Sequence, residues 1–157
     1  MSRWQEKKSV KKGNLGEDII LKWLEEKGWI CYSVTSDRPH AFDFLAVKNK
    51  KEIMIVEVKA KAKLNNFPET GIEIKHYNEY KEILEKYNIP VFIIFVDEML
   101  KEIYGNTLEE LDNDSRESPW GNQILFKMKN MIHIGNLTDE QAEELRKLSE
   151  RSYGYKL

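Results

Sequence analysis

Two short segments, Ala41-Phe42-Asp43-Phe44-Leu45-Ala46-Val47 and Ile53-Met54-Ile55-Val56-Glu57-Val58-Lys59-Ala60, carry the strongest structural signal in the chain. Both are rich in β-branched and aromatic residues, which favour strands. The five polar residues between them, 48–52, have the length of a hairpin loop. The sequence therefore predicts two antiparallel strands, 41–47 and 53–60, joined by a turn.

The apolar pattern also sets how these two strands pair. Side chains alternate between the two faces of a strand. If the turn centres on Lys50, Val47 lies opposite Ile53 and Asp43 lies opposite Glu57. A slip of one residue would carry Asp43 onto the apolar face of the second strand, which the pattern disfavours. We therefore expect two carboxylates to face each other at the end of the hairpin away from its turn.

Such a pair of carboxylates needs a cation. Directly opposed side chains have Cβ atoms roughly 4.5–5.5 Å apart, and like charges at that distance repel. Lys59 shares the face of Glu57 and supplies one positive charge. A divalent ion would supply more, and carboxylate oxygens favour Mg²⁺, Mn²⁺ or Ca²⁺. The residues alone leave open a metal site, a buried ion network without a catalytic role, and an exposed sheet edge.

A third carboxylate, Glu17, lies early in a predicted helix. Apolar residues at positions 15, 19, 20, 23 and 24 keep helical spacing, and Gly28 follows as a helix C-cap. Glu17 lies near the edge of this apolar stripe, so it could point toward the sheet. The default alternative is a charge on the outer face of the helix.

The remaining elements complete an α-β-β-β-α-β order, which indicates an α/β fold. The segment 29–34 reads as a first strand, with a loop at 35–40, and Ile72 and Ile74 alternate as a short strand. A helix is predicted over 77–88, and the apolar run 91–96 reads as a strand buried on both faces. Beyond it we expect strands at 103–104, 123–126 and 131–134, a surface loop at 112–120, and a helix that Thr138 opens with a capping box and that ends near Ser149.

Three motifs resemble those of the PD-(D/E)XK nuclease superfamily: Gly16-Glu17 in the first helix, Pro39-His40-Ala41-Phe42-Asp43-Phe44, and Glu57-Val58-Lys59. This superfamily includes restriction enzymes, archaeal Holliday junction resolvases and recombination exonucleases. The resemblance covers roughly residues 13–96, including the order of the elements. It implies a restriction-endonuclease-like fold, in which helices flank a mixed central sheet, extended here by C-terminal strands and a helix.

The resemblance also implies a chemistry for these residues. Asp43 and Glu57 would ligate Mg²⁺, or Mn²⁺ in its place, and Glu17 would contribute directly or through water. The carbonyl of Val58 would be a further ligand. Lys59 would position or deprotonate the attacking water. The implied activity is metal-dependent hydrolysis of phosphodiester bonds in DNA, with Asp43, Glu57, Lys59 and Glu17 as the catalytic set.

A second helical motif suggests contacts with nucleic acid. His76-Tyr77-Asn78-Glu79-Tyr80 is similar to the Q-x-x-x-Y element of exonuclease members, with His76 in place of Gln. There are simpler alternatives: the tyrosine packs between helix and sheet, and the histidine lies at the surface. Lys61 and Lys63 then serve only to keep an edge strand from pairing with another chain. The predicted nucleic-acid-binding residues are Lys61, Lys63, His76, Tyr80 and His40.

Composition limits the class of protein. The chain has 157 residues, of which 41% are hydrophobic and 33% charged, and this suits one folded domain. We expect a single nuclease-like domain over 13–157 and a flexible basic arm over 1–12. Apolar runs stay well below the ~20 residues that span a bilayer, so we expect no membrane partner. A single cysteine, Cys31, excludes internal disulfides and thiolate zinc sites, which favours a cytoplasmic protein.

The charge distribution bears on partners. Residues 1–63 hold 14 Lys and Arg against 9 Asp and Glu, whereas the rest of the chain holds 11 against 18. A basic half suits a polyanion such as DNA, although a lysine-rich solvated surface is the simpler interpretation. A homodimer, for paired cuts, and a partner protein, for specificity, stay open. The alternative function is a catalytically silent nucleic-acid-binding or protein-interaction module with the same fold.

Overall fold

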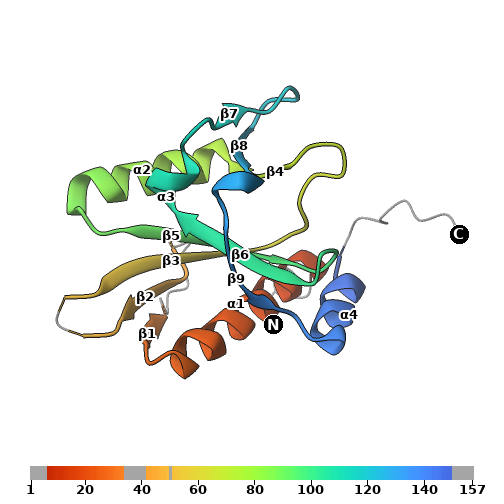
Figure 1. The fold of residues 1–157 in the computed structure, drawn as a ribbon, viewed down its shortest axis with the longest axis horizontal. Helices are drawn as coiled ribbons and strands as arrows, with labels where there is room; N and C mark the ends of the chain where they lie inside the picture. The colour runs from red at the N-terminus through yellow and green to blue at the C-terminus, as the bar shows by residue number, and fades with distance from the viewer. Residues whose placement is uncertain (1–6, 34–41, 50, 150–157) are drawn as a thin grey trace, which may run out of the picture.

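The computed structural model describes residues 7–33, 42–49 and 51–149. Within them, six strands form a central sheet in the order β1-β2-β3-β5-β6-β9 (Figure 1). The β3–β5 pair is parallel and every other neighbouring pair is antiparallel, so the sheet is mixed, as predicted. The strands are β1 (Ile30–Ser33), β2 (Phe44–Val47), β3 (Ile53–Ala60), β5 (Val91–Asp97), β6 (Glu102–Thr107) and β9 (Ile132–Asn136).

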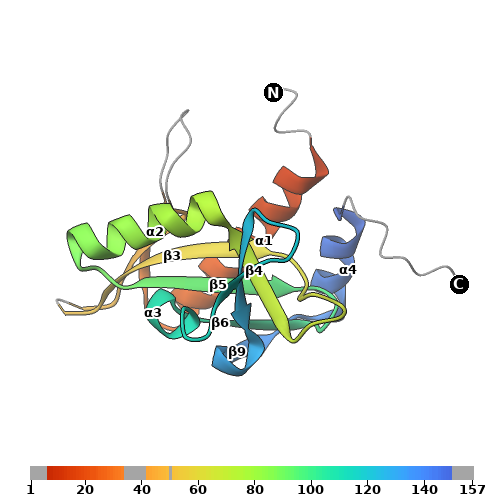
Figure 2. The ribbon, with the colours of Figure 1, turned by 90° about the horizontal axis from the view of Figure 1, so that it is seen from above.

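Helices cover both faces of this sheet (Figures 1 and 2). Helix α1 (Lys8–Glu26) buries the predicted apolar stripe, including Ile20 and Leu24, against one face, where α4 (Asp139–Lys147) also packs. Helix α2 (Ile74–Tyr87) and the short α3 (Leu108–Leu111) cover the other face. None of the helices in the described residues combines the length and apolar character needed to cross a membrane.

The hairpin has the predicted register, in which Val47 pairs with Ile53 and Phe44 with Val56. Strand β2 begins at Phe44, so it is shorter than the predicted segment 41–47, whose first residue lies outside the described residues. The pairing nevertheless continues by one bond, because the Asp43 N–H donates to the Val56 carbonyl at 3.2 Å. Asp43 therefore lies just before the strand, across from Glu57.

A second, three-stranded sheet differs from the sequence prediction. The short strand expected at 72–74 is β4 (Glu69–Glu73), which pairs with β8 (Gln123–Lys127), and β8 pairs with β7 (Arg116–Glu117) inside the expected surface loop. The buried Glu69 carboxylate holds this sheet together through Arg116 at 2.8 Å and Lys127 at 3.1 Å. Helix α2 follows β4 directly and so begins at Ile74, three residues earlier than predicted.

The C-terminal elements match the prediction in kind. Strands β6, β8 and β9 lie where strands were expected, and the short helix α3 and the 3₁₀ turn η1 (Met128–Asn130) were not anticipated. Helix α4 begins with the predicted capping box: the Thr138 hydroxyl accepts from the Gln141 N–H, and the Gln141 side chain accepts from the Thr138 N–H. The helix ends at Lys147, two residues before the expected end.

The start of helix α1 differs from the prediction of a flexible arm over 1–12. The helix begins at Lys8, so residues 8–12 are helical and the expected arm over 1–12 was too long. A tertiary contact explains the longer helix, because the Lys12 ammonium pairs with the fully buried Glu98 carboxylate at the end of β5. The earlier part of the arm, residues 1–6, lies outside the described residues.

Candidate active site

The three predicted carboxylates come together near the end of β3. Asp43 approaches from the residue before β2, and Glu57 lies within β3. Glu17 reaches them because α1 crosses this end of the strand at close range. A Cβ added at Gly16 would lie 2.9 Å from the Cβ of Ala60, so glycine at this position permits the close approach. The Glu17 carboxyl group then forms a side-chain hydrogen bond with Asp43.

Asp43 is held by the backbone of the opposite strand. Its Oδ2 accepts a hydrogen bond from the Val58 N–H at 2.7 Å. The sequence motifs point only to the Val58 carbonyl, and no local pattern indicates this N–H contact. Burial raises the pKa of Asp43 to about 7; the Val58 bond lowers it, and the nearby Glu17 charge adds to the increase. Asp43 therefore binds a proton far more readily than an ordinary aspartate.

Glu57 is only 7% exposed and has two partners. Its Oε1 lies 3.0 Å from the Lys59 ammonium, and the Tyr80 hydroxyl donates a hydrogen bond to its carboxylate. Burial nevertheless raises the pKa of Glu57, and burial likewise raises the pKa of Glu17. All three carboxyl groups are therefore in surroundings that disfavour their charged forms, and one lysine does not offset this.

Helix α2 supplies the other side of the site. The Lys59 Nζ lies 3.3 Å from the His76 Nδ1, and the His76 ring lies against Tyr80, with centroids 6.2 Å apart. Tyr80 is only 1% exposed. This burial corrects the expectation that Tyr80 contacts nucleic acid, because its ring packs in the core and its hydroxyl points to Glu57. His76 is half-buried beside the site.

The other predicted contacts with nucleic acid lie apart from the carboxylates. The Lys61 Nζ donates to the Gly71 carbonyl at 2.7 Å, and the Lys63 Nζ donates to the Leu64 carbonyl at 3.1 Å. The Lys61 ammonium group thus bonds to β4 itself, and that of Lys63 bonds to the segment that leads into β4. Their contact with phosphate remains a prediction, and His40 lies outside the described residues.

The donor chemistry of the site suits a hard divalent cation. In the described part of the chain, no group of three or more His, Cys, Asp or Glu side chains is already arranged around one point as metal ligands. Mg²⁺ in proteins is usually held by one or two carboxylates, together with waters and substrate phosphates. Asp43 and Glu57 can provide such a pair. A divalent cation between them would offset the unfavourable surroundings that raise their pKa values.

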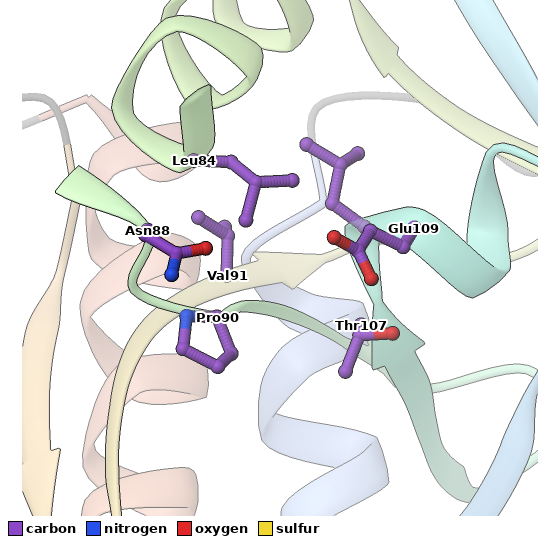
Figure 3. Close-up of a pocket in the computed structure, with 7 residues that line it drawn as sticks. Leu84, Asn88, Pro90, Val91, Thr107 and Glu109 are labelled. Carbon is purple, nitrogen blue, oxygen red and sulfur yellow. The ribbon is translucent and has the colours of Figure 1, made fainter. Parts of the chain in front are cut away.

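A separate cavity of about 270 Å³ lies at the other end of α2 (Figure 3). It is formed where the helix ends and β5 and α3 begin. Among the described residues that line it, Glu109 is the one acidic or basic side chain, so it offers no pair of groups for acid–base or metal chemistry. The lining consists of Leu84, Asn88, Pro90, Val91, Thr107, Leu108 and Glu109.

We expect the free energy of unfolding of the metal-free protein to fall as the pH rises from about 4 to about 7. The pKa of Asp43 is about 7 in the folded protein against an ordinary value of 3.8, so the folded state binds more protons in this window and loses stability as they leave. At about 1.4 kcal/mol per pKa unit, the loss has an upper bound of about 4 kcal/mol. Denaturant unfolding in EDTA at pH 4.5 and 8 measures it, and stability that rises with pH would contradict this account of Asp43.

Comparison with known proteins identifies solved structures with a similar fold. No protein-family model and no curated protein matches the chain. Among solved structures, the Holliday junction resolvase of the archaeal hyperthermophile Archaeoglobus fulgidus is similar with a TM-score of 0.59 and 13% identity, over 83% of this chain and 99% of the resolvase. A nuclease from a fusselovirus is similar with a TM-score of 0.53 and 14% identity, over 89% of this chain and 92% of the nuclease.

At these identities the likeness concerns the fold. The similar region takes in almost the whole of both nuclease chains. The mixed sheet and the helices on its two faces are those that the sequence motifs led us to expect. The expected α-β-β-β-α-β core corresponds to α1, β1, β2, β3, α2 and β5, and the additional strand β4 before α2 belongs to the second sheet. The chain therefore has the restriction-endonuclease-like fold of the PD-(D/E)XK nucleases.

Proposed function

We propose that this protein is a divalent-metal-dependent nuclease that hydrolyses phosphodiester bonds in DNA. The observation that carries the proposal is the meeting of Asp43 and Glu57 across the hairpin, with the Lys59 ammonium 3.0 Å from Glu57. The restriction-endonuclease-like fold, shared with two nucleases, supports it.

Asp43 and Glu57 would hold Mg²⁺, or Mn²⁺ in its place. Glu17 would contribute directly or through a water molecule, and the Val58 carbonyl would be a further ligand. A divalent ion held by these residues would supply Lewis-acid chemistry, polarising the phosphate and lowering the pKa of bound water. Helix α1 would serve the same site, because it brings the Glu17 side chain into interaction with Asp43.

Lys59 would act on the attacking water and on the phosphate. Its ammonium group can orient the water by hydrogen bonding, or, once deprotonated, accept a proton from it. The same group stabilises negative charge that develops on the phosphate oxygens as the water oxygen bonds to phosphorus and the phosphorus–oxygen ester bond breaks. The ion pair with Glu57 holds the Lys59 ammonium group beside the carboxylates, where both roles would require it.

A panel of labelled substrates tests this function. It contains single-stranded, duplex, flapped and four-way DNA and one RNA, each incubated with Mg²⁺, with Mn²⁺ and with EDTA. We expect cleavage of DNA that requires either metal and that stops in EDTA. The preferred DNA would name the substrate class, and paired cuts in four-way DNA would indicate a homodimer.

The absence of cleavage by folded protein with both metals would contradict the proposal. Salt-dependent binding of DNA would then indicate a silent nucleic-acid-binding module. The lack of both cleavage and binding would indicate a protein-interaction module. Restored cleavage on addition of a partner protein would instead show that specificity depends on that partner.

Glu17→Gln should raise the Mg²⁺ concentration needed for half-maximal cleavage by about 10-fold or more, the usual effect of disturbing a group that supports metal ligands. Gln keeps the size of the side chain but removes the charge beside Asp43. The rate measured against Mg²⁺ concentration shows the shift. Asp18→Asn is the matched control, because Asp18 is the exposed neighbour on the same helix. An unchanged Mg²⁺ dependence in Glu17→Gln would remove Glu17 from the site.

A further inference from the structure

We infer that His76 is a positioning residue, whose Nδ1 sets the direction of the Lys59 ammonium group. This inference rests on the proposed nuclease function and adds a residue to its machinery. It follows from the contacts of one side chain, Lys59, whose Nζ lies 3.0 Å from the Glu57 Oε1 and 3.3 Å from the His76 Nδ1.

These two contacts define the orientation of the ammonium group. A lysine ammonium has three N–H donors, so the two contacts use two of them and direct the third away from both partners. A lysine side chain is long and flexible, and a single partner would leave the group able to swing around it. The second contact, from α2, restricts that motion. Lys59 is 20% exposed, so the ammonium group remains within reach of a substrate.

His76 is itself held in place by its helix. It lies one turn before Tyr80 on α2, and residues four apart share a helix face. The His76 and Tyr80 rings lie 6.2 Å apart, and Tyr80 is fixed by burial and by its hydrogen bond to Glu57. One face of α2 therefore contacts both functional side chains of the Glu57-Val58-Lys59 motif.

The chemistry of this contact specifies what can replace His76. To accept a hydrogen bond from an ammonium group, Nδ1 must carry a lone pair, which places the ring proton on Nε2. The Oδ1 of an asparagine is an acceptor at the same number of bonds from Cα as Nδ1. A leucine fills similar space without an acceptor. His76→Asn should therefore preserve the contact, and His76→Leu should remove it.

The kinetics of these two variants test the inference. We expect His76→Leu to lower kcat for DNA cleavage by about 10- to 100-fold, a range typical of residues that orient a functional group, with KM within about twofold. His76→Asn should recover most of kcat. His133→Leu, at an exposed histidine on β9, is the matched control and should behave as the wild type. Equal loss of kcat in both His76 variants, or an effect confined to KM, would overturn the inference.

A measurement independent of activity separates this inference from the proposed function. The ¹⁵N chemical shifts of the His76 ring should report the Nε2–H form in the wild type and a change in Lys59→Met, with thermal unfolding as the check on folding. If the wild type shows this signature but cleaves nothing, the nuclease proposal fails while the contact stands. If the wild type cleaves DNA and the ring shifts are the same in Lys59→Met, the positioning role is wrong.

Discussion

Asp43→Asn should reduce metal-dependent DNA cleavage by about 10³-fold or more. A catalytic metal contributes several kcal/mol to transition-state stabilisation, and about 1.4 kcal/mol corresponds to a factor of ten in rate. Asparagine keeps an oxygen that can accept the Val58 N–H, now 2.7 Å from Oδ2, but it brings no charge into this buried position. We therefore also expect the metal-free variant at pH 8 to be as thermally stable as the wild type, or more stable.

The pairing of these two results distinguishes a metal site from a structural ion network. Asp114→Asn is the matched control: Asp114 is exposed, and its left-handed backbone conformation, with φ of 56°, is one that asparagine accepts. It should leave both cleavage and thermal stability unchanged. If Asp43→Asn strongly destabilises the metal-free protein, or if cleavage survives in it, Asp43 has a structural role and the proposed site is wrong.

Lys59→Met should lower cleavage by about 10²- to 10⁴-fold, the range for loss of a group that assists proton transfer. Methionine keeps the apolar stem of the side chain but removes the ammonium group. DNA binding should stay within a few-fold of the wild type, because Lys59 is only 20% exposed and is one charge among many lysines. Single-turnover rates and binding measured in Ca²⁺ separate the two quantities.

Removing this ammonium group should also raise the pKa of Glu57, which would remain buried without its ion-pair partner. Lys51→Met, at an exposed lysine of the hairpin turn, is the matched control and should cleave as the wild type does. Wild-type cleavage by Lys59→Met would show that the water is activated without Lys59. A loss of DNA binding as large as the loss of cleavage would assign Lys59 to substrate binding instead.

The central part of the site could be predicted because it depends on local pattern. The alternation of apolar residues favours the hairpin register that buries the apolar faces of both strands over a register slipped by one residue. In the structure Val47 pairs with Ile53, as that pattern requires. Once this register is set, Asp43 must lie across from Glu57. The helical spacing of α1 similarly placed Glu17 at the edge of a buried stripe, from which it reaches Asp43.

Other features depend on contacts between distant parts of the chain and left little local signal. Strands were predicted near β4 and β8, but β7 has two polar residues and β4 pairs with β8 some 50 residues away, so the local pattern did not reveal that the three form a second sheet. The start of α1 at Lys8 involves a lysine-rich segment whose Lys12 pairs with the buried Glu98. For Tyr80 the sequence left open helix–sheet packing and contact with nucleic acid, and the choice depends on how α2 lies across the sheet, which buries the ring.

The most direct test of this account is to locate a bound divalent ion. Substoichiometric Mn²⁺ added to ¹⁵N-labelled protein broadens the amide signals of residues near the ion. We expect broadening to be strongest around Asp43, Glu57, Val58 and Glu17, and to disappear in Asp43→Asn. Broadening centred elsewhere, such as on the acidic residues of α4, or broadening that is unchanged in Asp43→Asn, would contradict this account.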